Sequence, residues 1–182
     1  MKKLLALMLA LVMVLSMVAC DSFGSGNDTD EDDEDDKGTS VSLDSAEGVA
    51  KAYVLATVGG DADKFLDVTP KMMWDSYAEE CDLDEDYSRK DLLKELEAQI
   101  SAEDKVKVKI TDAEENDDYD EDDIEEAIER IADVYEFDTD DIDNAKVISV
   151  EYKVTLDGES AYAAANVICV KIDGDWYAIG NP

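Results

Sequence analysis

The chain lacks histidine altogether, and it is poor in proline and in basic residues. Of its 182 residues, two are proline and 16 are lysine or arginine, against 49 aspartates and glutamates. Without histidine, the chain cannot form a Ser-His-Asp triad, a Cys-His dyad or an imidazole metal site. The net charge of −33 excludes nucleic-acid binding through a basic face, because such a surface repels phosphates. These absences argue against an enzyme, and no cofactor is expected.

Residues 1–19 have the features of a secretion signal. Lys2 and Lys3 give it a positive start, and the apolar run that follows is too short to span a membrane. The segment ends in Met17–Cys20 (MVAC), which resembles a bacterial lipobox. The resemblance implies that Cys20 is lipidated, and that its acyl chains anchor the protein in the lipid bilayer at the extracytoplasmic face of the cell membrane. The competing interpretations are a membrane helix and an ordinary signal beside a chance cysteine.

Residues 20–43 are predicted to form a disordered acidic tether that begins at the lipidated cysteine. Within it, Asn27–Asp36 reads NDTDEDDEDD. Such a run cannot bury a core, and its charges repel each other, so the segment is expected to extend to at most roughly 75–80 Å. It would hold the domain away from the membrane and could bind divalent cations weakly.

Residues 44–182 are predicted to form a single α+β domain, because hydrophobic residues, 45% of the chain, recur there first in helical and then in alternating patterns. Asp44 or Ser45 can cap the first helix, and Gly59-Gly60 can end it. The other predicted elements are, in order, helices at 62–68, 70–77 and 88–100, a strand at 106–110, an irregular acidic stretch at 111–123, a helix at about 122–136 and a β-meander from 146 onward.

The register of the meander can be derived from its first turn. Apolar and polar residues alternate over Lys146–Leu156, and Asp157-Gly158 is the signature of a two-residue type I′ turn. Such a turn places Val150 opposite Ala165, so large residues on one strand face small ones on the next. This arrangement suits a curved sheet that holds a helix close.

Two segments carry a resemblance to a known fold. They are Ser45–Val68 (SAEGVAKAYVLATVGGDADKFLDV) and Val147–Gly180, which ends in VKIDGDWYAIG. They resemble the superfamily of nuclear transport factor two and ketosteroid isomerase, with its cystatin-like fold, and more narrowly the small lipoproteins of Firmicutes that carry such a domain. The resemblance implies helices packed on a curved antiparallel sheet in a cone, here with an extra acidic helix inserted in the sheet region. In the last strand, the alternation does not decide whether Trp176 or Tyr177 faces inward.

Four aromatic residues could line a pocket in such a cone: Tyr53, Trp74, Tyr77 and Tyr152. Isomerases and dehydratases of this fold use side chains in the cone, and a buried acid with a raised pKa could act there as a base. The competing interpretation is that the four aromatic residues belong to the core.

One acidic stretch matches the spacing of a calcium loop. Asp118, Asp120, Asp122 and Glu129 stand at positions 1, 3, 5 and 12 of such a loop, but Asp123 occupies the position that needs glycine. In so acidic a chain, chance matches are expected. These residues are therefore a weak candidate for a metal site.

Cys81 and Cys169 remain once Cys20 is lipidated. Outside the cell, two cysteines can form a disulfide. Two separate thiols are the alternative.

Together these features predict a surface-anchored lipoprotein whose domain is a non-catalytic binding or interaction module, with an unidentified protein or small molecule as partner. The alternatives are a small-molecule carrier or an isomerase- or dehydratase-like enzyme that uses the cone pocket, and a structural companion of an envelope complex. A filled interior with an apolar surface patch would favour a protein partner. An open apolar pocket with a shifted acid would favour a carrier or an enzyme.

Overall fold

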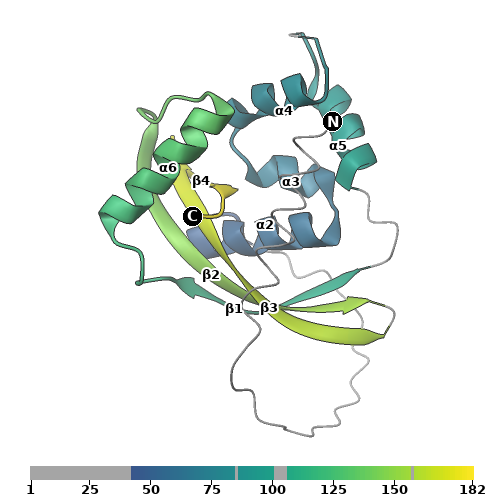
Figure 1. The fold of residues 1–182 in the computed structure, drawn as a ribbon, viewed down its shortest axis with the longest axis vertical. Coiled ribbons are helices and arrows are strands. Elements are labelled where there is room, and N and C mark those ends of the chain that lie inside the picture. Colours follow the sequence, from purple (N-terminus) through teal and green to yellow (C-terminus); the bar gives the residue numbers. More distant parts are fainter. Residues whose placement is uncertain (1–41, 85, 101–105, 157) are drawn as a thin grey trace, which may run out of the picture. The chain divides into compact units, whose positions relative to one another are not determined.

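In the computed structural model, the described residues are 42–84, 86–100, 106–156 and 158–182 (Figure 1). The predicted signal, the lipidation site Cys20 and all but the last residues of the predicted tether lie outside these ranges. The described part contains five α-helices, one short 3-10 helix and four strands, which form an open antiparallel sheet in the order β1-β2-β3-β4. The domain is therefore α+β. None of the helices in these ranges is long and apolar enough to cross a bilayer.

The first two helices have the bounds that their flanking residues predict. Helix α2 spans Ala46–Gly59, and the hydroxyl of Ser45 accepts the N–H of Gly48 at 3.1 Å. Gly60 ends the helix with a φ of 72°, a left-handed conformation that glycine adopts without steric cost. Helix α3 (Ala62–Val68) follows at once.

Two short elements and a longer helix follow. They are the 3-10 turn η1 (Lys71–Met73), helix α4 (Trp74–Glu80) and helix α5 (Arg89–Ile100). Ser88 and Asp91 form a capping box at the start of α5. The N–H of Ser88 donates to Asp91 Oδ2 at 3.0 Å, and the N–H of Asp91 donates to Ser88 Oγ at 3.3 Å.

Strand β1 (Lys107–Glu115) extends beyond Ile110, where the predicted strand ends. A β-bulge between Ile110 and Asp112 shifts the register against the neighbouring strand, so that Ala113 rather than Asp112 is the next half-buried residue. The predicted irregular stretch is therefore wrong for residues 111–115. The bulge interrupts the two-residue alternation on which a strand prediction depends.

Strands β2 (Ile142–Leu156) and β3 (Glu159–Ile172) form a long hairpin. Its register is the predicted one, with Val150 opposite Ala165. The final strand β4 (Asp175–Gly180) pairs with β3.

The pairing of β4 decides which of its aromatic residues faces the helices. Ala178 lies opposite Cys169, whose Sγ donates to the carbonyl oxygen of Ala46 in α2 at 3.4 Å. Side chains two residues apart in a strand lie on the same face, so Trp176 shares the face of Ala178 toward α2. Tyr177 lies on the other face. Both aromatic side chains are half-buried.

Helix α2 packs across one face of the sheet and contributes the centre of the core (Figure 1). The buried side chains at this contact include Val49 and Val54 of the helix and Ile148, Val150 and Val167 of the sheet. Burying each such side chain stabilises the fold by about 1.5–3 kcal/mol. The hairpin ends of β2 and β3, with the start of β1, extend beyond α2 (Figure 1).

Helix α6 (Glu121–Tyr135) is the predicted acidic helix between two strands. Its Ala127 and Ile128 are buried in the core. The Cδ1 atom of Ile131 lies 3.6 Å from the position that a Cβ on Gly180 would take, which places α6 against the end of β4.

Candidate functional site

Four aromatic side chains from four different helices pack in a row in the interior. Tyr53 of α2 contacts Phe65 of α3, with ring centroids 5.8 Å apart, and Phe65 contacts Tyr77 of α4 at 5.7 Å. Tyr77 then meets Tyr135 of α6 edge to face at 5.3 Å. We call this row the aromatic chain. Each such ring pair contributes about 0.5–1.5 kcal/mol beyond the burial of its surface, so the aromatic chain joins the four helices energetically.

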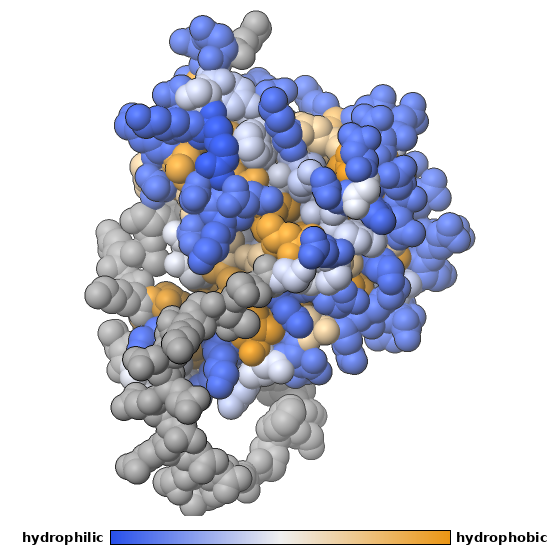
Figure 2. All heavy atoms as spheres, turned by 180° about the vertical axis from the view of Figure 1, so that it is seen from behind, coloured by the Kyte–Doolittle hydropathy of each residue, from blue (hydrophilic) through white to orange (hydrophobic). Residues whose placement is uncertain are grey.

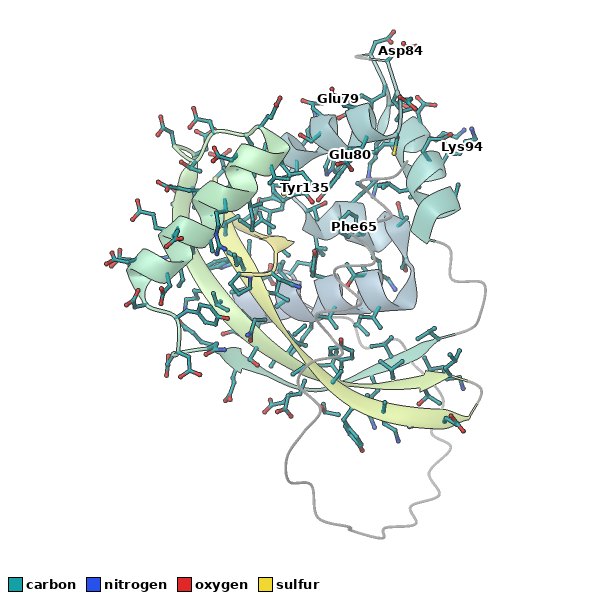
Figure 3. The ribbon with its side chains drawn as sticks, viewed as in Figure 1. Phe65, Glu79, Glu80, Asp84, Lys94 and Tyr135 are labelled. Carbon is teal, nitrogen blue, oxygen red and sulfur yellow. The ribbon has the colours of Figure 1, made fainter. Side chains whose placement is uncertain are left out.

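The aromatic chain runs from the core toward the surface. Its first three members are buried, and Tyr135 is half-buried. Figure 3 shows Phe65 and Tyr135 in the space between α3, α4 and α6, with Glu80 of α4 beside them. Glu80 is exposed. Burial raises the pKa of Tyr135, and the negative charge of Glu80 raises it further.

The phenols deeper in the aromatic chain are held in the neutral form. Burial is the main cause that raises the pKa of Tyr53 above its ordinary value of 10.0, and the neighbouring Tyr135 and Cys169 add to it. The pKa of Tyr77 is raised for the same reasons, by burial first and then by Tyr135 and Tyr53. At neutral pH these groups are uncharged packing elements.

The structure brings together only two of the four predicted pocket residues, Tyr53 and Tyr77. Trp74 is not among the ring contacts that join them, and the guanidinium of Arg89 lies 6.0 Å from its ring centroid. Its indole Nε1 is buried and has no hydrogen-bond partner among the described residues. Tyr152 lies in the sheet and is only 1% exposed.

Sequence reasoning missed the other two members of the aromatic chain, Phe65 and Tyr135. Each lies on the apolar stripe of a predicted helix, and that stripe indicates burial. It does not indicate which helices face each other, because inter-helix contacts depend on packing of the whole domain.

Alkaline pH is expected to destabilise the domain through the aromatic chain. Tyr53 and Tyr77 have folded-state pKa values above the ordinary 10.0. Their contribution to stability is therefore complete below about pH 10 and is lost as the pH rises above it, by up to about 1.4 kcal/mol per tyrosine and pH unit. Urea unfolding between pH 8 and 11.5, with absorbance at 295 nm to follow phenolate, measures this loss.

The matched control is the double variant Tyr53→Phe/Tyr77→Phe, which keeps the rings and removes both ionisable groups. Its free energy of unfolding should decline less steeply above pH 10. An equal decline in the variant and the parent would contradict the assignment.

The residues with calcium-loop spacing, a weak candidate for a metal site, do not form such a loop in the structure. Helix α6 begins at Glu121, so most of the loop positions are helical. The Asp120 carboxylate caps this helix by accepting the N–H of Asp123 at 3.0 Å, and the Asp123 carboxylate accepts the N–H of Asp120 at 3.4 Å. Asp118, Asp122 and Glu129 do not gather with Asp120: across the described ranges, no group of three or more potential metal ligands lies together.

Cys81 and Cys169, which could have formed a disulfide, are not bonded to each other in the structure, which has both as thiols. Cys169 is fully buried in β3 and packs against the start of α2. Cys81 lies at the C-cap of α4 and is half-buried. The alternative of two separate thiols is the one that the structure has.

A groove of about 520 Å³ lies at the C-terminal end of α6. It forms because Glu136 ends the helix in a left-handed conformation, with a φ of 53°, and turns the chain back. Its lining residues are Glu129, Ala132, Asp133, Phe137, Asp138 and Thr139. With three carboxylates in this lining, the groove disfavours anionic ligands.

Comparisons with family models, with curated proteins and with solved structures find no match to this chain. Any function therefore has to be inferred from its own residues and geometry.

Proposed function

We propose that this chain is a lipid-anchored protein of the extracytoplasmic face of the cell membrane, and that its domain is a non-catalytic binding or interaction module of the cone-shaped, cystatin-like type. The anchor is inferred from the Met17–Cys20 sequence after an apolar signal. The fold proposal is supported by the open antiparallel sheet with α2 across one face and α3 and α4 beside it.

The observation that carries the binding proposal is the aromatic chain. Tyr53, Phe65 and Tyr77 form a row of buried rings in contact, and Tyr152 is a further buried ring in the sheet. A ligand would have to displace these rings, at a cost of several kcal/mol. Binding is therefore assigned to the outer surface. Hydrophobic side chains gather near the middle of the face shown in Figure 2, which favours a protein partner.

One observation favours the alternative, a small-molecule carrier or an isomerase- or dehydratase-like enzyme. Glu80 lies beside Tyr135, where the aromatic chain reaches the surface (Figure 3). An acid and a phenol side by side can exchange protons with a bound molecule. Because Glu80 is exposed rather than buried, this pair supports the alternative less strongly than the filled interior supports the first proposal.

Replacing Cys20 with serine is expected to abolish membrane attachment. The parent should stay with the membranes after a high-salt wash and should carry the mass of acyl chains on Cys20, since only the cysteine thiol accepts the lipid. The variant should lack this mass. An unmodified Cys20 in the membrane-bound parent would contradict the proposed anchor.

The binding proposal is tested by cross-linking the lipidated protein on intact cells and identifying what it captures. One reproducible protein partner, lost on competition with the purified domain, would support the interaction module. A small molecule that co-purifies without any protein would overturn it in favour of the carrier.

A further inference from the structure

The far ends of β1, β2 and β3 carry a row of lysines beside an exposed tyrosine. The strand register places Lys109 opposite Lys153, and Lys153 opposite Tyr162. Lys107 lies two residues before Lys109 and has the same parity. We call these four residues the basic face. They lie toward the start of β1 and toward the ends of β2 and β3 that face each other across the hairpin.

The basic face points away from the core. Val108 and Ile110 alternate with the two lysines of β1 and are half-buried against the helices, so Lys107 and Lys109 lie on the opposite side of the sheet. Tyr162 is 76% exposed, and Lys153 Nζ lies 5.8 Å from the centroid of its ring. The result is an outward-facing surface of three lysines and one exposed aromatic ring, in which Lys107 and Lys109 are exposed and Lys153 is half-buried.

This arrangement is unfavourable for the isolated domain. Like charges directly opposite each other on neighbouring strands destabilise a sheet, and Lys109 faces Lys153. Among the described residues, none of the three lysines forms an ion pair with a carboxylate, although acidic residues outnumber basic ones threefold in the chain, 49 to 16. The nearest pair along the same strands is acidic, Asp112 opposite Glu151. A cluster of lysines that forms no ion pairs within the described residues suits binding to an anionic partner outside the chain.

We infer that the basic face docks onto a bilayer surface that contains anionic phospholipid. Lysine and tyrosine are side chains that favour the headgroup level, where their apolar parts are covered and their polar ends stay wet. Asp112 and Glu151 lie beside the lysines on the same face and would oppose this attraction in part, whereas salt would screen acidic residues that lie more than about 8–10 Å from the headgroups. Those acidic residues would still disfavour any other orientation.

The docking would operate within the proposed lipid anchoring. The chain between Cys20 and Ser42 can span at most roughly 75–80 Å. This length is an upper limit, so the tether that can hold the domain away from the membrane also allows the domain to return to the membrane that holds its acyl chains. The inference therefore rests on the proposed location, but the binding of the face to lipid can be measured without the anchor.

The test uses the chain from residue 20 onward with Cys20→Ser, so that no acyl chain contributes. Sedimentation is measured with vesicles of phosphatidylcholine containing 40% phosphatidylglycerol and with vesicles of phosphatidylcholine alone, at 25 and 150 mM salt. Binding to the anionic vesicles at low salt, weaker at 150 mM, is expected. The triple variant Lys107→Gln/Lys109→Gln/Lys153→Gln should weaken this binding by about fivefold or more per lysine, and Tyr162→Ser should also weaken it.

The matched control removes the same charge from the helical side, by Lys71→Gln/Lys90→Gln/Lys94→Gln, and should bind like the parent or within twofold of it. Circular dichroism confirms that each variant is folded. No binding to anionic vesicles at 25 mM salt, or equal losses in both triple variants, would overturn the inference. Preferential binding to soluble polyglutamate would also overturn it, in favour of an acidic protein partner. None of these outcomes depends on whether Cys20 is lipidated in the cell.

Discussion

Replacing Phe65 with alanine is expected to lower the free energy of unfolding by about 3–5 kcal/mol. Phe65 is the central ring of the aromatic chain and contacts both Tyr53 and Tyr77, with centroids 5.8 and 5.7 Å away. Its side chain is only 7% exposed. The substitution removes the transfer free energy of the ring, leaves a cavity and breaks two aromatic contacts. Urea unfolding followed by circular dichroism measures the change.

The matched control is Tyr162→Ala, which removes a ring of similar size from an exposed position. Its effect should stay within about 0.5 kcal/mol. The comparison also bears on function. If Phe65→Ala costs less than about 1 kcal/mol, the interior around Phe65 is not closely packed, and the carrier or enzyme alternative would become the better proposal.

The thiol of Cys169 is expected to react with a disulfide reagent about a thousandfold more slowly than an ordinary cysteine in the folded protein at pH 8. Burial raises its pKa from 9.0 to about 12, and the nearby Glu47 carboxylate adds to the shift. The thiolate is the reactive species, so each unit of pKa reduces the reactive fraction about tenfold. Access is also blocked, because Cys169 is fully buried.

The measurement uses the chain from residue 20 with Cys20→Ser, purified without reductant, and follows thionitrobenzoate release. The half-buried Cys81 should react first, and Cys169 should react only on unfolding in urea. In the Cys81→Ser variant, only the slow reaction of Cys169 should remain. Two fast phases in the folded protein would contradict the burial of Cys169. No release even in urea would show that the two cysteines form a disulfide in solution.

The local features of this fold could be predicted from the sequence because they depend on residues close together in the chain. Ser45 and Gly60 set the ends of α2, and the register in which Val150 meets Ala165 is the one that the Asp157-Gly158 sequence predicts. A cap or a two-residue turn acts through hydrogen bonds and backbone conformations within a few residues. These features therefore do not depend on how the domain packs.

The candidate site could be predicted only in part. Of the four aromatic residues predicted to line a pocket or to belong to the core, Tyr53 and Tyr77 both contact Phe65. Trp74 lies under Arg89, and Tyr152 is buried in the sheet. The helical stripes that contain Phe65 and Tyr135 indicate burial without naming a partner. Which rings meet depends on the crossing of four helices, and that is a property of the packed domain.

By itself, the sequence determined the helix ends, the hairpin register and the acidic character of the surface, since each depends on local chemistry or on composition. Only the tertiary structure decided three other features: the bulge that prolongs β1 past Ile110, the aromatic chain, and the basic face made by Lys109, Lys153 and Tyr162. These three residues come from three strands. In a sheet, the neighbours across strands are set by pairing between distant segments, so the lysines become one surface only when the strands assemble.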